Sequence, residues 1–194
     1  MYRKMLGEDH YFLPIQENML GVLYLDSQQY PKAETHIKRG LSRLEAIFEP
    51  THNEILTAVI NLGEVYNRTQ RAGQADALFA KFSSDEPSLL NAAVKLRWAT
   101  SKRLMGDFPP IADLIAFAAP VYGDYLEPGH RLSINLLVEQ AHALLRSGNV
   151  EAAREKTEAA ARHIAEHPTI TAWQLERAEA EVKALRASLD DRTP

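Results

Sequence analysis

The chain has 194 residues, 45% of them apolar, and a formal net charge of −4, which suits one globular domain or one array of repeats. This weak acidic balance gives no field that would attract nucleic acid or an anionic membrane, so we expect neither as a partner. The absence of cysteine excludes disulfides and thiolate zinc sites, and it is compatible with the cytoplasmic location that we expect.

Four short polar segments resemble one another, and each of them precedes a run with helical apolar periodicity. They begin at residues 7, 49, 86 and 127, at intervals of 42, 37 and 41 residues. They read Gly7-Glu8-Asp9-His10, Glu49-Pro50-Thr51-His52, Glu86-Pro87-Ser88 and Glu127-Pro128-Gly129-His130. A period of about 40 residues indicates stacked supersecondary units.

A second pattern recurs inside each unit, where one small residue on a first helix is followed by another on a second helix. The first two units read Leu20-Gly21-x-x-Tyr24 with Ala33-x-x-x-Ile37, and Leu62-Gly63-x-x-Tyr66 with Ala75-x-x-x-Phe79. The fourth unit reads Gln140-Ala141-x-x-Leu144 with Ala153-x-x-x-Thr157, and the degenerate third unit reads Trp98-Ala99 with Ile111-x-x-x-Ile115. Small side chains allow two antiparallel helices to approach closely. Ile111 breaks this rule, so we expect the third unit to pack more loosely.

These motifs resemble the tetratricopeptide repeat, and their long spacing resembles the variant of kinesin light chains and of many bacterial multi-repeat proteins. The segment Leu6-Gly7-Glu8-Asp9-His10 is similar to the linker of that variant. The resemblance implies an all-α fold, a right-handed α-solenoid of about four helix-turn-helix repeats, formed as a single domain over residues 1–194. The expected repeats lie near 7–48, 49–85, 86–126 and 127–167, and a capping helix lies near 169–189.

Periodicity and turn residues place the individual helices. First helices are expected near 12–27, 53–69, 88–105 and 130–147, and second helices near 31–48, 73–83, 109–125 and 150–166. The residues from Met1 to Leu6 read like the tail of a preceding second helix. We therefore expect the chain to be a fragment of a longer protein.

No catalytic, cofactor or metal site is expected. The sequence has no glycine-rich phosphate loop, no G-x-S-x-G motif and no cysteine nucleophile, so we expect a protein that is not an enzyme. His10, His52 and His130 hold equivalent loop positions in different units, which are offset by about 8–10 Å. Zinc–nitrogen bonds measure about 2 Å, so these histidines cannot share one ion. His163 and His167 lie one helical turn apart but lack a third ligand.

The resemblance also implies a concave groove, lined by the first helices, that binds an extended peptide. Register from the small residues assigns to this groove Asn18, Asn61, Glu64, Arg68, Arg97, Arg103, His142 and Arg146. Asparagine can hold a peptide backbone, and arginine can grip a carboxylate with two hydrogen bonds. The expected partner is therefore a protein or peptide with acidic side chains. The alternative for these arginines is ordinary solvation.

A structural role is the second hypothesis. The run from Ile111 to Tyr125 is rich in large apolar residues and is either a buried second helix or the face of a homo-oligomer. In the latter case the chain is a self-associating or regulatory spacer domain. It would belong to a longer signalling protein such as a serine/threonine kinase or a transcription regulator.

Overall fold

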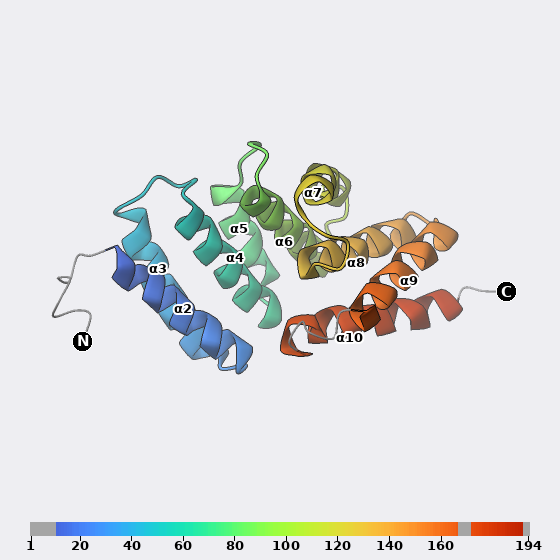
Figure 1. The fold of residues 1–194 in the computed structure, drawn as a ribbon, viewed down its shortest axis with the longest axis horizontal. Coiled ribbons are helices and arrows are strands. Elements are labelled where there is room, and N and C mark those ends of the chain that lie inside the picture. The colour runs from blue at the N-terminus through green and yellow to red at the C-terminus, as the bar shows by residue number, and fades with distance from the viewer. Residues whose placement is uncertain (1–10, 167–171, 192–194) are drawn as a thin grey trace. The chain divides into compact units, whose positions relative to one another are not determined.

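The computed structural model describes residues 11–166 and 172–191, which form helices with no strand among them (Figure 1). The helices are α2 (Phe12–Asp26), α3 (Tyr30–Glu45), α4 (Asn53–Arg68), α5 (Ala72–Phe82), α6 (Leu89–Met105), α7 (Ile111–Tyr125), α8 (Arg131–Arg146), α9 (Val150–Glu166) and α10 (Ala172–Asp190). The predicted all-α fold is confirmed, and the predicted helix ends agree to within three residues. The expected start of the last helix, near residue 169, lies outside the described residues.

The chain divides into two compact units, residues 1–86 and 87–194, and each is described by itself. In unit 1, α2 packs against α3, α4 packs against α5, and α3 also contacts α4. In unit 2, α6 pairs with α7, α8 pairs with α9, and α10 contacts both α8 and α9. These pairs correspond to the expected helix-turn-helix units, whereas one solenoid over residues 1–194 stays a prediction.

The recurrent glycines lie where the two helices of a pair touch. A Cβ atom on Gly63 would overlap the ring of Phe79, with Cε1 and Cε2 only 2.7 and 2.8 Å away. A Cβ atom on Gly21 would meet Cγ1 of Ile37 and lie 3.1 Å from the backbone nitrogen of the same residue. Both neighbours are fully buried, so neither can move aside easily. The predicted reason for a small residue at these positions is confirmed.

The turn inside each pair contains one residue in the left-handed backbone region. Unit 1 uses Gln28 and Gln70, with φ angles of 59° and 60°, and unit 2 uses Gly106 and Gly148, with φ angles of 76° and 82°. Glycine adopts this region without the steric cost that a side chain brings. The four turns are therefore equivalent, including the turn of the third pair, whose sequence pattern is degenerate.

Helix α7 is packed into the core of unit 2. Its residues Ile111, Leu114, Ile115, Val121 and Tyr122 are buried in one cluster with apolar residues of α6 and α8. These five side chains of the run are therefore not available to a second copy of the chain, whereas Tyr125 at its end is 69% exposed. Among the described helices, none combines the length and the apolar character that crossing a membrane requires.

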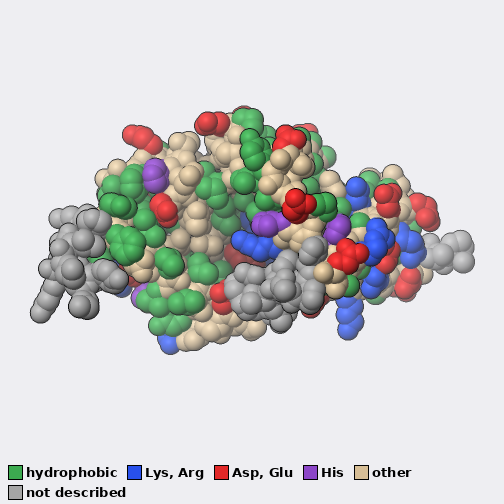
Figure 2. Space-filling view, viewed as in Figure 1, with side chains coloured by type: hydrophobic (Ala, Val, Ile, Leu, Met, Phe, Trp, Pro, Cys, Tyr) green, Lys and Arg blue, Asp and Glu red, His purple; other side chains and the backbone are tan. Residues whose placement is uncertain are grey.

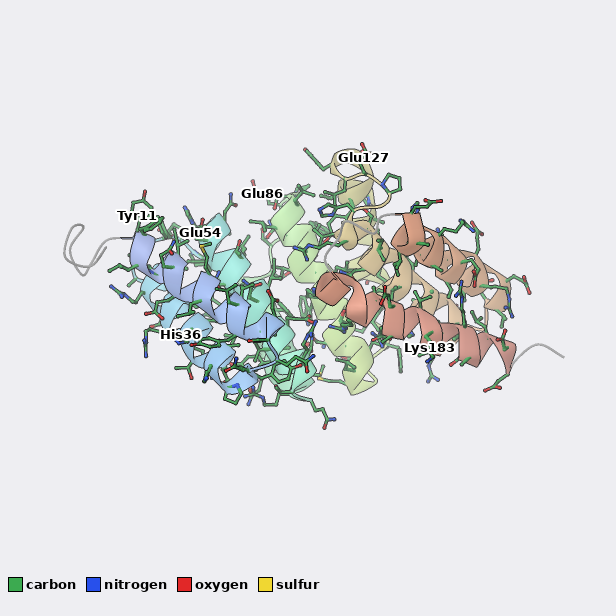
Figure 3. All side chains as sticks on the ribbon, turned by 60° about the horizontal axis from the view of Figure 1, so that its bottom comes forward. Tyr11, His36, Glu54, Glu86, Glu127 and Lys183 are labelled. Carbon is green, nitrogen blue, oxygen red and sulfur yellow. The ribbon has the colours of Figure 1, made fainter. Side chains whose placement is uncertain are left out.

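Helix α10 covers the last helix pair of unit 2, as expected of the cap. Four of its residues are buried against α8 and α9, and they are Ala178, Val182, Leu185 and Leu189. They lie at intervals of three or four residues and so form one apolar stripe along the helix. Lys183, next to this stripe, is exposed (Figure 3).

Replacing Val182 with alanine is expected to lower the free energy of unfolding by about 1–2 kcal/mol, because buried methyl groups are lost. Urea denaturation measures this change. The matched control is Lys183→Ala on the same helix, which is expected to stay within about 0.5 kcal/mol of the parent chain. Equal stability of the two variants would show that α10 does not belong to the core.

Candidate functional site

All predicted site residues lie on the first helix of a pair, which is α2, α4, α6 or α8. In each unit we call the surface that they mark the first-helix face. It is defined by Asn18, Asn61, Glu64 and Arg68 in unit 1 and by Arg97, Arg103, His142 and Arg146 in unit 2. The structure connects several of these residues through hydrogen bonds and ion pairs within their own unit.

In unit 1, an amide pair links the two first helices. Nδ2 of Asn61 on α4 donates a hydrogen bond to Oδ1 of Asn18 on α2, over 3.3 Å. Asn18 is buried, and Asn61 is half-buried. A side-chain amide has two donor hydrogens and an oxygen with two lone pairs, so one mutual hydrogen bond leaves capacity for a peptide group.

An ion pair lies further along the same stripe of α4. Nε of Arg68 donates to Oε1 of Glu64 over 2.8 Å, and Glu64 is buried. Burial lowers the pKa of the Arg68 guanidinium, but the charge of Glu64 and hydrogen bonds with Glu64 and Tyr30 raise it further, above its ordinary value. Asn61, Glu64 and Arg68 are spaced by three and four residues and therefore share one side of the helix.

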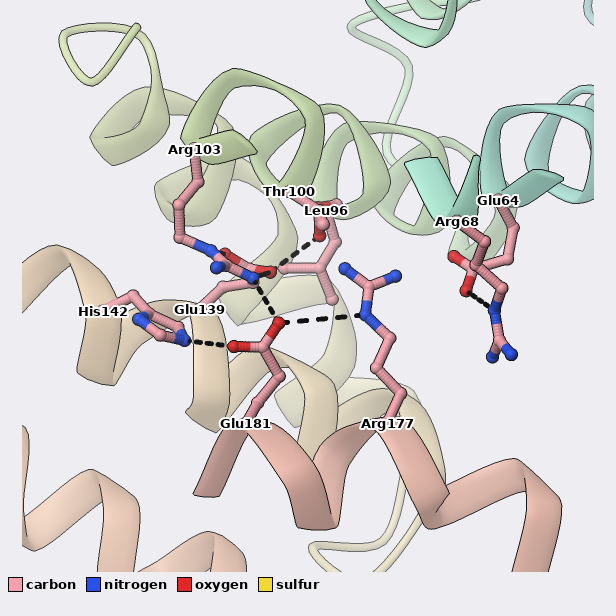
Figure 4. A network of polar contacts seen from close by, with 9 residues as sticks. All are labelled: Glu64, Arg68, Leu96, Thr100, Arg103, Glu139, His142, Arg177 and Glu181. Carbon is pink, nitrogen blue, oxygen red and sulfur yellow. Dashed lines mark hydrogen bonds and ion pairs between the residues drawn. The ribbon is translucent and has the colours of Figure 1, made fainter. Parts of the chain in front are cut away.

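In unit 2, a polar network joins α6, α8 and α10 (Figure 4). Arg103 donates from Nε and Nη2 to the two carboxylate oxygens of Glu139, over 3.0 and 3.2 Å, and its Nη2 also donates to Glu181 over 3.0 Å. Thr100 donates to the same Glu139 over 2.7 Å. His142 Nε2 lies 2.8 Å from Oε2 of Glu181, so both predicted site residues, Arg103 and His142, contact one carboxylate of α10.

The network fixes the charge state of Glu181. Burial raises the pKa of this carboxyl, but the hydrogen bond from His142 and the charge of Arg103 lower it more, to about 2. The pKa of Arg103 is also moved upward, because its carboxylate partners outweigh the effect of burial. Arg103 therefore already holds two carboxylates of its own chain, at the place where a peptide carboxylate was expected.

The other two predicted site arginines of unit 2 are Arg97 and Arg146. Arg146 is exposed, and its guanidinium carbon lies 4.6 Å from the centre of the Phe108 ring, a cation–π distance. Arg97 is half-buried on α6 and takes part in further electrostatic contacts. Arg146 is thus the predicted arginine of this face whose charge is most open to a partner.

Sequence reasoning did not identify Glu139 and Glu181 as counter-ions of Arg103. Glu181 lies 78 residues from Arg103 in the chain, so no local spacing relates the two. One feature of the sequence could have pointed to Glu181. It directly precedes Val182, which belongs to the apolar stripe of α10. An acidic residue beside a buried stripe marks the edge that faces neighbouring helices.

The recurrent histidines have a structural role in two of the loops. Nδ1 of His52 accepts a hydrogen bond from the backbone nitrogen of Glu54 over 3.3 Å, and Nδ1 of His130 accepts one from Leu132 over 3.2 Å. These histidines therefore cap the first turns of α4 and α8. His10 lies outside the described residues, as does His167. Within residues 11–166 and 172–191, no group of three metal-ligating side chains is present.

An apolar strip borders the first-helix face of unit 1. Met19, Leu20 and Leu23 of α2 are 56%, 38% and 65% exposed. Figure 2 shows hydrophobic side chains gathered over this helix. Met19 directly follows Asn18 in the chain, so this strip lies on the same helix as one member of the amide pair. Exposed apolar patches of this kind are common at protein-binding surfaces.

Comparison with known proteins agrees with the sequence pattern. Residues 12–81 match the family model described as tetratricopeptide repeat, so the resemblance is confirmed for this part of the chain. None of the curated proteins matches the sequence.

Solved structures with a similar fold include two of nearly identical tetratricopeptide-repeat-like units from a kinesin light chain-like protein of Podosopora anserina. The first is 16% identical in sequence and superposes with a TM-score of 0.64. The match covers 92% of this chain and 89% of the other chain. The second is 17% identical in sequence and superposes with a TM-score of 0.62. The match covers 92% of this chain and 95% of the other chain. At these identities the likeness shows the fold alone.

Proposed function

We propose that this chain, with its kinesin-light-chain-like tetratricopeptide repeats, is a non-catalytic module that binds an extended, partly acidic peptide of another protein. Tetratricopeptide repeats generally mediate protein–protein interactions, and the fold is typically a non-catalytic scaffold. The binding surface proposed here is the first-helix face of unit 1.

The observation that carries the proposal is the arrangement of Asn18, Asn61 and Arg68 on one face of unit 1. Asn61 is half-buried and keeps one donor hydrogen and its carbonyl oxygen for a peptide backbone, while the buried Asn18 accepts its other donor hydrogen. Arg68 lies two turns from Asn61 on the same side of α4, and one of its nitrogens is used by Glu64. Its guanidinium also hydrogen-bonds Tyr30, and its further N–H groups can donate to an acidic side chain of the peptide. The apolar strip of Met19, Leu20 and Leu23 supplies contact area beside these polar groups.

Arg103 has a structural role in unit 2. Its guanidinium bridges Glu139 and Glu181, so it ties α10 to α6 and α8. A substitution at Arg103 would disturb that bridge and the fold around it. Tests of peptide binding therefore use residues of unit 1.

The test is selection of peptides from a displayed library of random dodecapeptides, with the complete chain as bait. We expect acidic peptides to be enriched and their enrichment to be lost on the variant Glu64→Gln/Arg68→Gln. This double variant keeps the net charge, because it removes one acidic and one basic side chain together. It also avoids leaving the buried Glu64 without its cation.

The matched control is Glu34→Gln/Arg71→Gln, which removes a second ion pair of unit 1 with the same charge balance. Nη2 of Arg71 lies 2.7 Å from Oε2 of Glu34, and neither residue belongs to the first-helix face. The control variant is expected to retain the selected peptides. Enrichment that is equal on both variants would place the binding surface elsewhere, and the absence of any enrichment would refute peptide binding.

A further inference from the structure

Helix α2 is apolar on more than one side. Leu13 and Leu25 are buried within unit 1, whereas Met19, Leu20 and Leu23 form the exposed apolar strip that Figure 2 shows over this helix. A surface helix normally has one apolar side and one polar side, and a helix that is apolar all round is normally buried all round. The exposed apolar surface that the sequence placed on α7 as the face of a homo-oligomer therefore has its counterpart on α2.

The next helix pair shows that the fold buries the positions of this strip. The recurrent glycines of the two pairs are 42 residues apart, so Leu20 and Leu23 correspond to Leu62 and Val65 of α4. Leu62 and Val65 are only 3% and 0% exposed, and α4 packs against both α3 and α5. The described part of the chain begins at Tyr11 and contains no second helix ahead of α2. The strip is thus a packing surface to which the described residues bring no second helix.

The strip offers no charge to a partner and no repulsion to an identical strip. From Phe12 to Leu25 the one charged side chain is that of Glu17. This carboxylate is held by His36 and Arg39 of α3, over 2.7 and 3.5 Å. A charged partner would find no complementary group here, whereas two copies of an uncharged apolar surface can meet without repulsion between like charges.

The strip is also symmetric about its own midpoint. Ile15, Met19 and Leu23 follow one another at intervals of four residues and lie on one line along α2. If two copies of α2 pack antiparallel around a two-fold axis at Met19, Ile15 of each copy faces Leu23 of the other. The two methionines meet on the axis, where the flexible thioether adapts to its neighbour. This symmetry is what a contact between identical surfaces requires.

The other end of the helix array does not fit onto this strip. The exposed side chains of α10 between residues 177 and 190 are small or charged, and they include Glu179, Lys183 and Arg186. Packing α10 of one copy against α2 of another would bury these charges on an apolar surface, which is unfavourable. Association of α2 with α2 therefore gives a closed dimer and no filament.

We propose that the apolar strip of α2 is the contact surface of a symmetric, reversible homodimer. The proposal goes beyond peptide binding and needs none of the residues that define the first-helix face. One helix from each copy buries less than the roughly 1,200 Å² at which standard interfaces begin, so the dimer is weak. We expect a dissociation constant of about 10–500 µM.

Sedimentation equilibrium of the complete chain at about 5–500 µM tests this proposal. The mass should rise with concentration from the 21.8 kDa of one chain toward twice that value. Leu23→Lys should weaken the dimer at least about tenfold, because the contact would bury an ammonium group. The matched control is Leu104→Lys in unit 2, where Leu104 is 48% exposed, and it should dimerise as the parent chain does.

Circular dichroism should give both variants the melting temperature of the parent chain, because both leucines are exposed. A parent chain that stays monomeric over the whole range would overturn the proposal and assign the strip to a different polypeptide. Equal dimerisation of Leu23→Lys and the parent chain would overturn it as well.

Single cysteines test the arrangement of the two helices, since the chain has no cysteine of its own. Met19→Cys places its thiol at the two-fold axis and should form an intermolecular disulfide on mild oxidation. Leu23→Cys lies four residues from the axis in each copy, so its two thiols are about 12 Å apart along the helices, too far for a disulfide. Cross-linking of both variants at equal rates would overturn the antiparallel arrangement.

The variant Glu64→Gln/Arg68→Gln separates this proposal from the proposed function. It should dimerise as the parent chain does, because neither residue belongs to the strip. Because the proposed peptide also contacts the strip, a saturating amount of a selected peptide should lower the fraction of dimer. Loss of peptide selection with intact dimerisation would concern the first-helix face alone. A parent chain that selects peptides and stays monomeric would overturn the dimer alone.

Discussion

Replacing Arg103 with methionine is expected to lower the free energy of unfolding by about 3–5 kcal/mol, because Glu139 is left buried without its cation. Glu139 is 4% exposed and accepts two hydrogen bonds from Arg103 and one from Thr100. Methionine retains much of the volume of the arginine stem, so the loss reports on the charge and not on a cavity. Urea denaturation at neutral pH measures it.

A double variant identifies the unpaired carboxylate as the cause. Arg103→Met/Glu139→Gln should recover most of the lost stability, because the amide of glutamine carries no charge that needs a partner. The two substitutions are therefore expected to be strongly non-additive. If Arg103→Met alone stays within about 1 kcal/mol of the parent chain, the network is solvated and does not hold the three helices together.

The same network gives stability that depends on pH. The pKa of Glu181 is lowered from its ordinary 4.5 to about 2. Its contribution is therefore complete above the ordinary pKa of an unfolded glutamate and is lost as the pH falls toward 2. The variant Glu181→Gln lacks this carboxyl group. As the pH falls from about 4.5 to about 2, the free energy of unfolding of the variant should therefore decrease less than that of the parent chain.

Replacing Gly63 with alanine is expected to lower the free energy of unfolding by about 1–3 kcal/mol, although alanine favours helix more than glycine does. The added Cβ would overlap the ring of Phe79, which is fully buried. Either the ring or the two helices of the pair must shift. Thermal denaturation with circular dichroism measures the loss.

A compensating substitution tests the contact directly. Phe79→Leu takes away the ring atoms that the new Cβ would meet, so Gly63→Ala should cost less in the Phe79→Leu background than in the parent chain. Gly123→Ala is the matched control, since its Cβ meets no heavy atom within 4 Å, and it should stabilise the helix by about 0.5–1 kcal/mol. An unchanged melting temperature for Gly63→Ala would show that the assigned register is wrong.

The helices and their pairing follow from the sequence because one pattern encodes both. Gly21 and Gly63 mark the crossing point within a pair, and the apolar residues around them repeat with helical spacing. Each of these signals is local, within about one repeat of the chain. The third pair shows the limit of the motif, since its turn keeps the same backbone geometry at Gly106 although the sequence around it is degenerate.

The sequence predicts which residues of the first helices share a face. It does not predict which of their charges are already paired within the chain. Register from the small residues places Asn18 and Asn61 on facing helices, and they form a hydrogen bond. Which arginine remains open depends on acids far away in the chain, such as Glu181, and on how α10 packs.

The most direct measurement of the central proposal is the affinity of one selected acidic peptide for three forms of the chain, determined by isothermal titration calorimetry. The parent chain and Glu34→Gln/Arg71→Gln are expected to bind the peptide with equal affinity. Glu64→Gln/Arg68→Gln is expected to bind it about tenfold more weakly or worse, a difference of about 1.4 kcal/mol. Equal affinity for all three forms would contradict the assignment of the binding surface to the first-helix face of unit 1.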